Sequence, residues 1–244
     1  MPAAGETPRP GAELTISAIP DQDPEKLARI YGAVSSYLGE KLGVAVVYKP
    51  VTDYTASVTA YRRGDLDAVF FGGLSGVQAR LQVPGSVVLA QRDIDEDFHS
   101  VFIAGPGTGL TAIPDVAGLR LLRGRSLTFG SETSTSGRVM PQFFLGEAGV
   151  VPADLNGAPG FSGSHDATIK LVEAGAFEVG AVNAAVWDAR VQDGTVDPSK
   201  VVEIFRTPGY HDYHWLGSPR LAEKLGAGFT DRLRAALLDL DGSD

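Results

Sequence analysis

Apolar residues in this chain fall into short runs and helical repeats that follow one another in strand–helix order. Residues 13–20 (ELTISAIP) form an apolar run of strand length, and a Pro-Asp turn signal follows it. Leu27, Tyr31 and Leu38 then recur at helical spacing until Gly43, which ends the helix. The same order continues, so we predict strands at 13–20, 44–51, 66–73, 86–92 and 99–105, and helices at 24–42, 54–63 and 74–81.

The second half of the chain restarts this pattern. We predict strands at 126–130, 157–163 and 177–183, followed by helices at 138–148, 164–174 and 185–191, and then strands at 201–207 and 213–218 before one helix at 220–240. Short joints between strands and helices are typical of a mostly parallel sheet with helices on both faces. The prediction is an α/β fold with two lobes, in which residues 13–104 plus 206–244 form lobe 1 and residues 105–205 form lobe 2. The chain would cross between them near 103–106 and 204–208, as a two-stranded hinge.

Composition narrows the possible functions. The chain has 244 residues, 43% hydrophobic and 21% charged, so it can form a stable core, and it contains no cysteine for disulfides, thiolate zinc sites or thiol catalysis. A net charge of −9 argues against nucleic acid and anionic membranes as partners. No apolar run reaches the roughly 18 residues of a membrane span. Residues 1–12 lack signal-peptide features and are rich in Pro, Gly and Ala, which predicts a disordered tail.

A cluster of hydroxyl side chains lies where a predicted strand turns into a helix. The segment GSETSTSG, residues 130–137, places Ser134, Thr135 and Ser136 directly before Gly137. Such a joint directs backbone N–H groups and the positive end of the helix dipole at one point. Oxyanions carry only acceptors, so neutral donors suit them. One serine would suffice as a helix N-cap, and a run of hydroxyls favours anion binding over capping.

Three other joints have a similar composition. His165 and Asp166 follow Ser164 in SGSHDAT, Gly72 and Gly73 precede a helix after FF, and Tyr54 follows VTD. His165 could donate a hydrogen bond to an anion. If these joints faced one another across two lobes, they would form a ligand cleft.

Taken together, GSETSTSG, SGSHDAT and VNAAVWD, with LTISAIP, VTDY and FFGG, resemble the periplasmic phosphonate/phosphite-type substrate-binding proteins of ABC transporters. The resemblance covers about residues 14–215, and within the family the motifs are most similar to those of a selenate-binding subgroup. It implies a type II periplasmic-binding-protein fold, a periplasmic or surface-anchored location, a permease partner and a monomer, without enzymatic activity, cofactor or metal. The ligand would be a small tetrahedral oxyanion: phosphonate, phosphite, phosphate or selenate.

The resemblance also assigns binding residues. It implies ligand contacts for Tyr54, Ser134, Thr135, Ser136 and His165, and suggests Asp188 as an acidic member of the site. Gly72 and Gly73 are further candidates, because their position before a helix would expose its N–H groups. The segment before Asp188 offers Ala184 and Ala185, so we expect no carboxylate for an amine-bearing ligand. A compact oxyanion should therefore bind more tightly than 2-aminoethylphosphonate.

Three alternatives compete with import. A ligand-sensing protein for a membrane receptor could use the same fold. A Ser/His-dependent hydrolase is disfavoured, because the chain has no G-x-S-x-G elbow and His165 and Asp166 are sequence neighbours, poorly placed for one to orient the other. A metal site at His211 and His214 is disfavoured too, since residues three apart in a strand face opposite sides.

Overall fold

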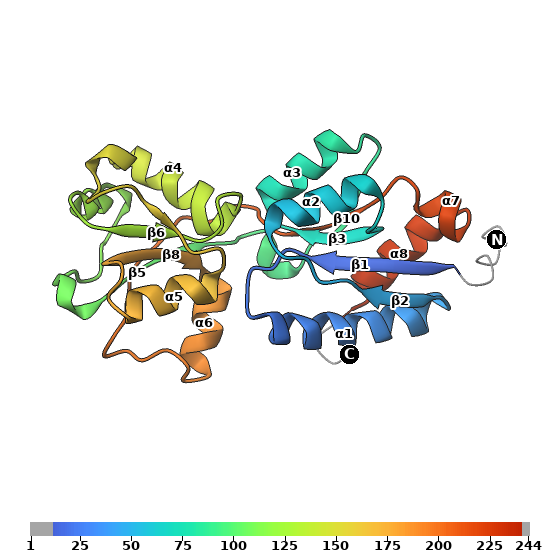
Figure 1. Cartoon of the computed structure of the whole chain (residues 1–244), viewed down its shortest axis with the longest axis horizontal. Coiled ribbons are helices and arrows are strands. Elements are labelled where there is room, and N and C mark those ends of the chain that lie inside the picture. Colours follow the sequence, from blue (N-terminus) through green and yellow to red (C-terminus); the bar gives the residue numbers. More distant parts are fainter. Residues whose placement is uncertain (1–11, 241–244) are drawn as a thin grey trace. The chain divides into compact units, whose positions relative to one another are not determined.

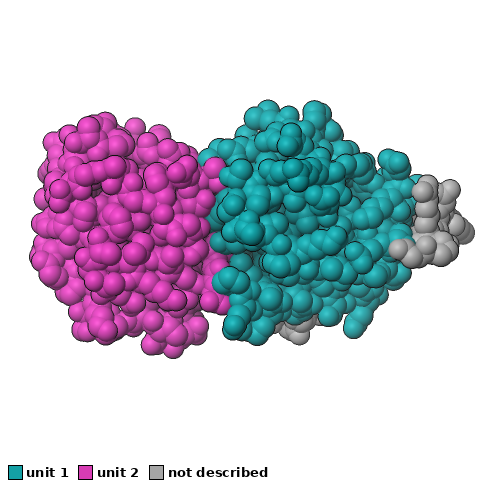
Figure 2. Space-filling view, viewed as in Figure 1, with its two compact units in different colours: residues 1–20, 24–93, 213–244 teal, residues 21–23, 94–212 magenta. Residues whose placement is uncertain are grey.

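The computed structural model describes residues 12–240 and divides the chain into two compact units (Figure 2). Unit 1 comprises Met1–Pro20, Pro24–Asp93 and Tyr213–Asp244, and unit 2 comprises Asp21–Asp23 and Ile94–Asp212. Each unit contains one five-stranded mixed sheet with helices, as an α/β fold with two lobes requires. Residues 1–11 of the predicted tail lie outside the described residues.

The units divide at 93/94 and 212/213, rather than at 104/105 and 205/206 as the sequence suggested. The reason is strand pairing. β5 (Ser100–Ala104) pairs antiparallel with β8 (Val179–Asn183) on one side and β9 (Val202–Arg206) on the other, so β5 lies inside the unit 2 sheet. The predicted crossings near 103–106 and 204–208 therefore overlap the ends of β5 and β9, inside this sheet.

Unit 1 is built on a sheet of order β2-β1-β3-β10-β4, in which β1, β2 and β3 are parallel and β10 is antiparallel to β3 and β4. Buried Leu14, Ile16 and Phe71 contribute to its core. The helices α2 and α3 cover one face, and α1 and α8 the other (Figure 1). The strands are β1 (Glu13–Ala18), β2 (Ala45–Tyr48), β3 (Ala68–Phe71), β4 (Val87–Ala90) and β10 (His214–Gly217), and the helices are α1 (Pro24–Leu42), α2 (Tyr54–Arg63), α3 (Gly73–Gln82), α7 (Leu221–Leu225) and α8 (Phe229–Leu238).

The single terminal helix predicted for 220–240 is wrong, because the structure has two helices there. α7 ends at Leu225 and α8 begins at Phe229. Between them Gly226 and Gly228 have φ angles of 101° and 74°, in the left-handed region that glycine adopts without steric cost. The apolar periodicity continues across the break, which is why it resembled one helix.

Unit 2 has a sheet of order β7-β6-β8-β5-β9, with β6, β7 and β8 parallel. The helix α4 covers one face, and α5 and α6 cover the other (Figure 1). Buried Phe102, Phe129 and Ala181 contribute to the core beneath α4. Its remaining elements are β6 (Leu127–Phe129), β7 (Gly160–Phe161), a π-helix (Thr135–Val139), α4 (Met140–Glu147), α5 (His165–Glu173), α6 (Ala184–Gln192) and short 3-10 helices at Pro106–Thr108, Val116–Leu122 and Pro152–Asp154. Another 3-10 helix, Asp93–Asp95, spans the boundary between the units.

The parallel strands decide where the predicted site residues lie. The carboxyl ends of neighbouring parallel strands meet at one edge of a sheet, where α/β proteins bind ligands. In unit 2 this edge carries the loops that follow β6, β7 and β8, and in unit 1 it carries those that follow β2 and β3. Residues 130–137, which we call the hydroxyl loop, and His165 thus belong to one edge of the unit 2 sheet.

Candidate ligand-binding site

The hydroxyl loop folds back on itself after β6 and opens into a π-helix. The Gly130 N–H donates to the Gly137 carbonyl at 2.9 Å, and the Val139 N–H donates to the Ser134 carbonyl, five residues back, at 3.0 Å. Single π-helical turns are rare in proteins, and those that do occur are often found at functional sites. The wide turn spans Thr135–Val139 and leads directly into α4.

The hydroxyls in this loop have different roles. Ser134 is the N-cap, since its Oγ accepts a hydrogen bond from the Gly137 N–H at 2.9 Å. Ser136 is 1% exposed, and its buried Oγ has no hydrogen-bond partner among the described residues. Thr135, between them, is also buried. Capping therefore accounts for Ser134 but leaves Ser136 unexplained.

His165 is the first residue of α5 and is completely buried. Its Nδ1 accepts a hydrogen bond from the Asn183 backbone N–H, at 3.3 Å, so the proton of the neutral ring lies on Nε2. Burial lowers the pKa of His165 to about 4, despite the opposing charge of Asp166. At neutral pH the ring is uncharged, and Nε2 is a buried donor with no hydrogen-bond partner among the described residues.

Glycine brings the imidazole against the hydroxyl loop. A Cβ placed on Gly137 would lie 2.9 Å from the Ser134 Oγ and 3.1 Å from the His165 Cε1, and both contacts are too close. A Cβ on Gly130 would lie 3.8 Å from the His165 Nδ1, an ordinary van der Waals distance. The absence of a side chain at Gly137 therefore allows the loop after β6 and the start of α5 to meet.

The combination is chemically specific. The Ser136 hydroxyl and the His165 Nε2–H are buried, neutral donors from one edge of one sheet, and no acceptor in the described part of the chain satisfies them. Unpaired buried donors are costly, so a site that retains two of them is suited to a ligand that brings acceptors. An oxyanion is such a ligand.

Asp166, next to His165, is committed to the protein. Its Oδ1 accepts from the Arg190 Nε at 2.6 Å, and its Oδ2 accepts from the Asp23 N–H at 2.7 Å. Burial alone would raise the pKa of Asp166, but the hydrogen bond and charge of Arg190 bring it below its usual range. The carboxylate is therefore ionised and fully engaged.

Asp188 does not share the contacts of the hydroxyl loop. It lies on α6, where its two oxygens accept from the Arg206 guanidinium at 2.9 and 2.6 Å, and Arg206 also pairs with Glu203 at 2.9 Å. The Asp188 side chain is 53% exposed, unlike the buried donors. The structure thus brings Ser134, Thr135, Ser136 and His165 together and gives Asp188 a separate partner.

The predicted residues of unit 1 lie at two helix starts. Tyr54 is the first residue of α2, 1% exposed, after an N-cap in which the Asp53 Oδ1 accepts from the Ala56 N–H at 2.7 Å. Gly72 is the N-cap of α3 and Gly73 its first residue. These joints follow β2 and β3, two parallel strands that both neighbour β1.

Sequence analysis did not identify Ser100 and Tyr210, whose hydroxyl groups support the backbone of the hydroxyl loop. The Ser100 Oγ donates to the Ser136 carbonyl at 2.7 Å and lies 2.6 Å from the Tyr210 hydroxyl. Burial, with the charge of Asp212, raises the pKa of Tyr210 well above its usual range. Ser100 resembles any strand residue in sequence, and Tyr210 lies more than 70 residues after the loop, so no local pattern marks them.

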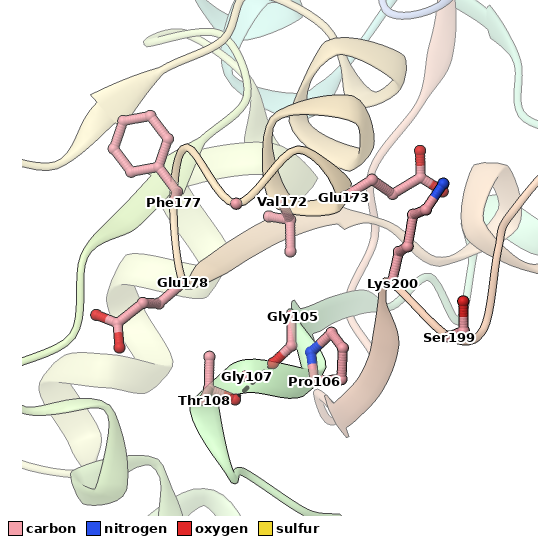
Figure 3. Close-up of a pocket in the computed structure, with 11 residues that line it drawn as sticks. Gly105, Pro106, Gly107, Thr108, Val172, Glu173, Phe177, Glu178, Ser199 and Lys200 are labelled. Atoms are coloured by element: carbon pink, nitrogen blue, oxygen red, sulfur yellow. Dashed lines mark hydrogen bonds between the residues drawn. The ribbon is translucent and has the colours of Figure 1, made fainter.

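A cavity of unit 2 lies at the opposite end of β8 from the hydroxyl loop (Figure 3). It has a volume of about 310 Å³ and is lined by residues that include Thr108, Phe177, Glu178 and Lys200. Glu178 already pairs with Arg125 at 2.7 Å, and Lys200 with Asp197 at 3.3 Å. The cavity offers paired charges rather than unpaired donors, which distinguishes it from the hydroxyl loop.

Two classes of feature are absent from residues 12–240. No group of three or more histidine and acidic side chains there is arranged to hold a metal ion, and His211 and His214 fall in different units. None of the helices described is both long and apolar enough to cross a bilayer.

Comparison with known proteins places the chain among transport proteins. Residues 16–244 match the family model described as the phosphonate, periplasmic substrate-binding protein of ABC transporters. The chain is 48% identical over 229 residues to the probable phosphite-binding protein PhnD1 of Prochlorococcus marinus MIT 9301, covering 93% of this chain and 77% of that one. It is 25% identical over 205 residues to the phosphate-import protein PhnD of Mycolicibacterium smegmatis, covering 80% of this chain and 62% of that one.

Solved structures agree with this comparison. PhnD1 in complex with methylphosphonate has a TM-score of 0.93 and 46% identity, over 96% of this chain and 86% of that chain. The binding protein of a Pseudomonas aeruginosa phosphonate transporter has a TM-score of 0.75 and 15% identity, over 94% of this chain and 74% of that chain, and this likeness shows the two-lobed fold alone.

Proposed function

The chain belongs to the periplasmic phosphonate substrate-binding proteins of ABC transporters, and on that premise we propose that it captures phosphite or methylphosphonate at the hydroxyl loop of unit 2. It is a transport component rather than an enzyme. The buried Ser136 hydroxyl and His165 Nε2–H carry the proposal, because they are donors with no hydrogen-bond partner among residues 12–240.

The donor set supports a small oxyanion in energetic terms. A hydrogen bond to a charged group contributes about 1.5–3 kcal/mol, and micromolar affinity requires about 8 kcal/mol. Ser136 and His165, with the buried Thr135 beside them, would supply much of this from unit 2. We propose Tyr54, Gly72 and Gly73 as further contacts, on the family resemblance and their positions at helix starts.

The acidic residues support a ligand without an amine. A buried ammonium needs a carboxylate partner, since leaving it unpaired costs several kcal/mol. Asp166 is engaged by Arg190 and Asp23, and Asp188 by Arg206. Neither is available without breaking an existing ion pair, so we leave Asp188 out of the proposed site.

The geometry of His165 also argues against hydrolysis. In a catalytic triad a carboxylate orients the histidine through Nδ1. Here Nδ1 is bonded to the backbone of Asn183, and the adjacent Asp166 binds Arg190 instead. The proposal is reversible capture by a monomer that delivers its ligand to a permease, in the periplasm or attached to the cell surface.

A ligand panel tests this proposal. Thermal shift should be measured with phosphite, methylphosphonate, phosphate, sulfate, selenate and arsenate, and affinities then determined by calorimetry. Phosphite or methylphosphonate should raise the melting temperature with increasing concentration, as binding to the folded state requires. Stabilisation by sulfate or selenate with no response to either phosphorus compound would contradict the proposal.

A further inference from the structure

A short strap, Asp21–Asp23, belongs to unit 2 although both flanking segments belong to unit 1. Two hydrogen bonds hold the strap on the first turn of α5. The His165 backbone N–H donates to the Asp21 carbonyl at 2.9 Å, and the Asp23 N–H donates to the Asp166 Oδ2 at 2.7 Å. The strap therefore attaches at the residue that presents the proposed ligand donor and at its neighbour.

The second oxygen of Asp166 extends this attachment to α6. Arg190, near the end of α6, places its Nε 2.6 Å from the Asp166 Oδ1. Helical side chains tilt toward the helix N-terminus, so Arg190 reaches back along α6. The side chains of Asp166 and Arg190 are 7% and 22% exposed, so water screens this pair less than a surface pair. One carboxylate thus joins the strap, α5 and α6.

The imidazole of His165 depends on the same two helices. Its backbone starts α5, while its Nδ1 is fixed by the N–H of Asn183, which is the last residue of β8 and the N-cap of α6. A shift of α5 against α6 would lengthen this 3.3 Å bond and release the constraint that keeps the proton on Nε2. The Asp166–Arg190 pair bridges these helices.

Resting on the proposed function, we infer that Asp166 and Arg190 are positioning residues that hold His165 in the tautomer and orientation needed to donate to the ligand, and that fasten the strap to the same turn. Neither side chain contacts the ligand in this account. The pair acts through His165.

The variants Asp166→Asn, Arg190→Gln and Arg190→Lys test the inference. Asp166→Asn keeps an acceptor for the strap but loses the charge that holds Arg190, and Arg190→Lys retains the charge on a differently shaped side chain. The matched control is Arg125→Gln, which removes the Arg125–Glu178 ion pair of 2.7 Å at the opposite end of β8. Circular dichroism identifies any variant that does not fold, and the variants that do fold then test the positioning role.

Three measurements are needed. Calorimetry with phosphite should show at least tenfold weaker binding for Asp166→Asn and Arg190→Gln, partial rescue in Arg190→Lys, and less than a twofold change in Arg125→Gln. Nitrogen NMR of His165 without ligand should show the Nε2–H tautomer in the wild type and a mixture in the first two variants. Hydrogen exchange at the Asp23 amide should accelerate in the same variants.

The results distinguish failure of the positioning role from failure of the proposed binding site. Weak binding by His165→Gln, with unchanged affinity and tautomer in folded Asp166→Asn and Arg190→Gln, would overturn the positioning role alone. Unchanged phosphite binding by His165→Gln would overturn the proposed site, whereas the NMR and exchange measurements would still report on the positioning, because they require no ligand.

Discussion

Ser136→Ala should change stability and affinity in opposite directions. The wild-type Oγ is buried without a hydrogen-bond partner among the described residues. An unsatisfied buried group of this kind costs about 1–3 kcal/mol. Its removal should stabilise the ligand-free protein by about 1 kcal/mol, or roughly 2–4 °C in melting temperature for a protein of this size.

The same change should weaken ligand binding. If Ser136 donates to an oxyanion, its loss removes a hydrogen bond to a charged acceptor, about 1.5–3 kcal/mol. This corresponds to a roughly 10- to 150-fold increase in Kd. Calorimetry with phosphite and methylphosphonate, together with denaturant unfolding without ligand, measures both effects on one variant.

Ser134→Ala provides the contrast. Ser134 caps the π-helix through the Gly137 N–H at 2.9 Å, so its loss should destabilise the ligand-free protein by about 1 kcal/mol. Opposite signs of stability change at these two serines would distinguish the cap from the binding hydroxyl. The reasoning fails if Ser136→Ala destabilises the ligand-free protein as Ser134→Ala does and binds phosphite normally.

Further predictions concern His165, Gly137 and the ligand. Burial lowers the pKa of His165 to about 4, so the unfolded chain binds more protons between about pH 6.5 and 4. The stability of the folded protein should therefore decrease as the pH is lowered from about 6.5 to 4, and denaturant unfolding of His165→Gln should show a shallower dependence; equal slopes would contradict the burial. Gly137→Ala should cost about 1–3 kcal/mol and weaken phosphite binding, because its Cβ meets Ser134 and His165, while Gly146→Ala, with nothing within 4 Å, should leave both intact. Methylphosphonate should bind at least tenfold more tightly than 2-aminoethylphosphonate by calorimetry, and the reverse order would show that a carboxylate leaves its arginine to meet the amine.

Sequence periodicity predicted the strand–helix order because each element buries one apolar face, and this requirement is local. The boundaries between the two units could not be predicted in this way, because they depend on which strands pair with one another. Nothing near Ser100–Ala104 indicates that this strand lies antiparallel between β8 and β9. The break at Gly226 and Gly228 was missed because the apolar spacing continues through it, although two glycines so close together were a usable signal.

The candidate site was likewise predictable only where it depends on local sequence patterns. Ser134 to Ser136 and His165 were identifiable because donors at a strand–helix joint form a local pattern. The division of roles between cap and free donor depends on hydrogen bonds within the folded loop. The pairing of Asp188 with Arg206, 18 residues away on another element, was likewise not visible in sequence.

A crystal structure with methylphosphonate tests the central claim most directly. We expect phosphonate oxygens within about 3 Å of the Ser136 Oγ and the His165 Nε2, a normal length for such hydrogen bonds. The Asp188–Arg206 pair should remain closed, with its oxygens 2.9 and 2.6 Å from the guanidinium. A ligand bound elsewhere, with the Ser136 hydroxyl and His165 Nε2 still lacking acceptors, would contradict the account.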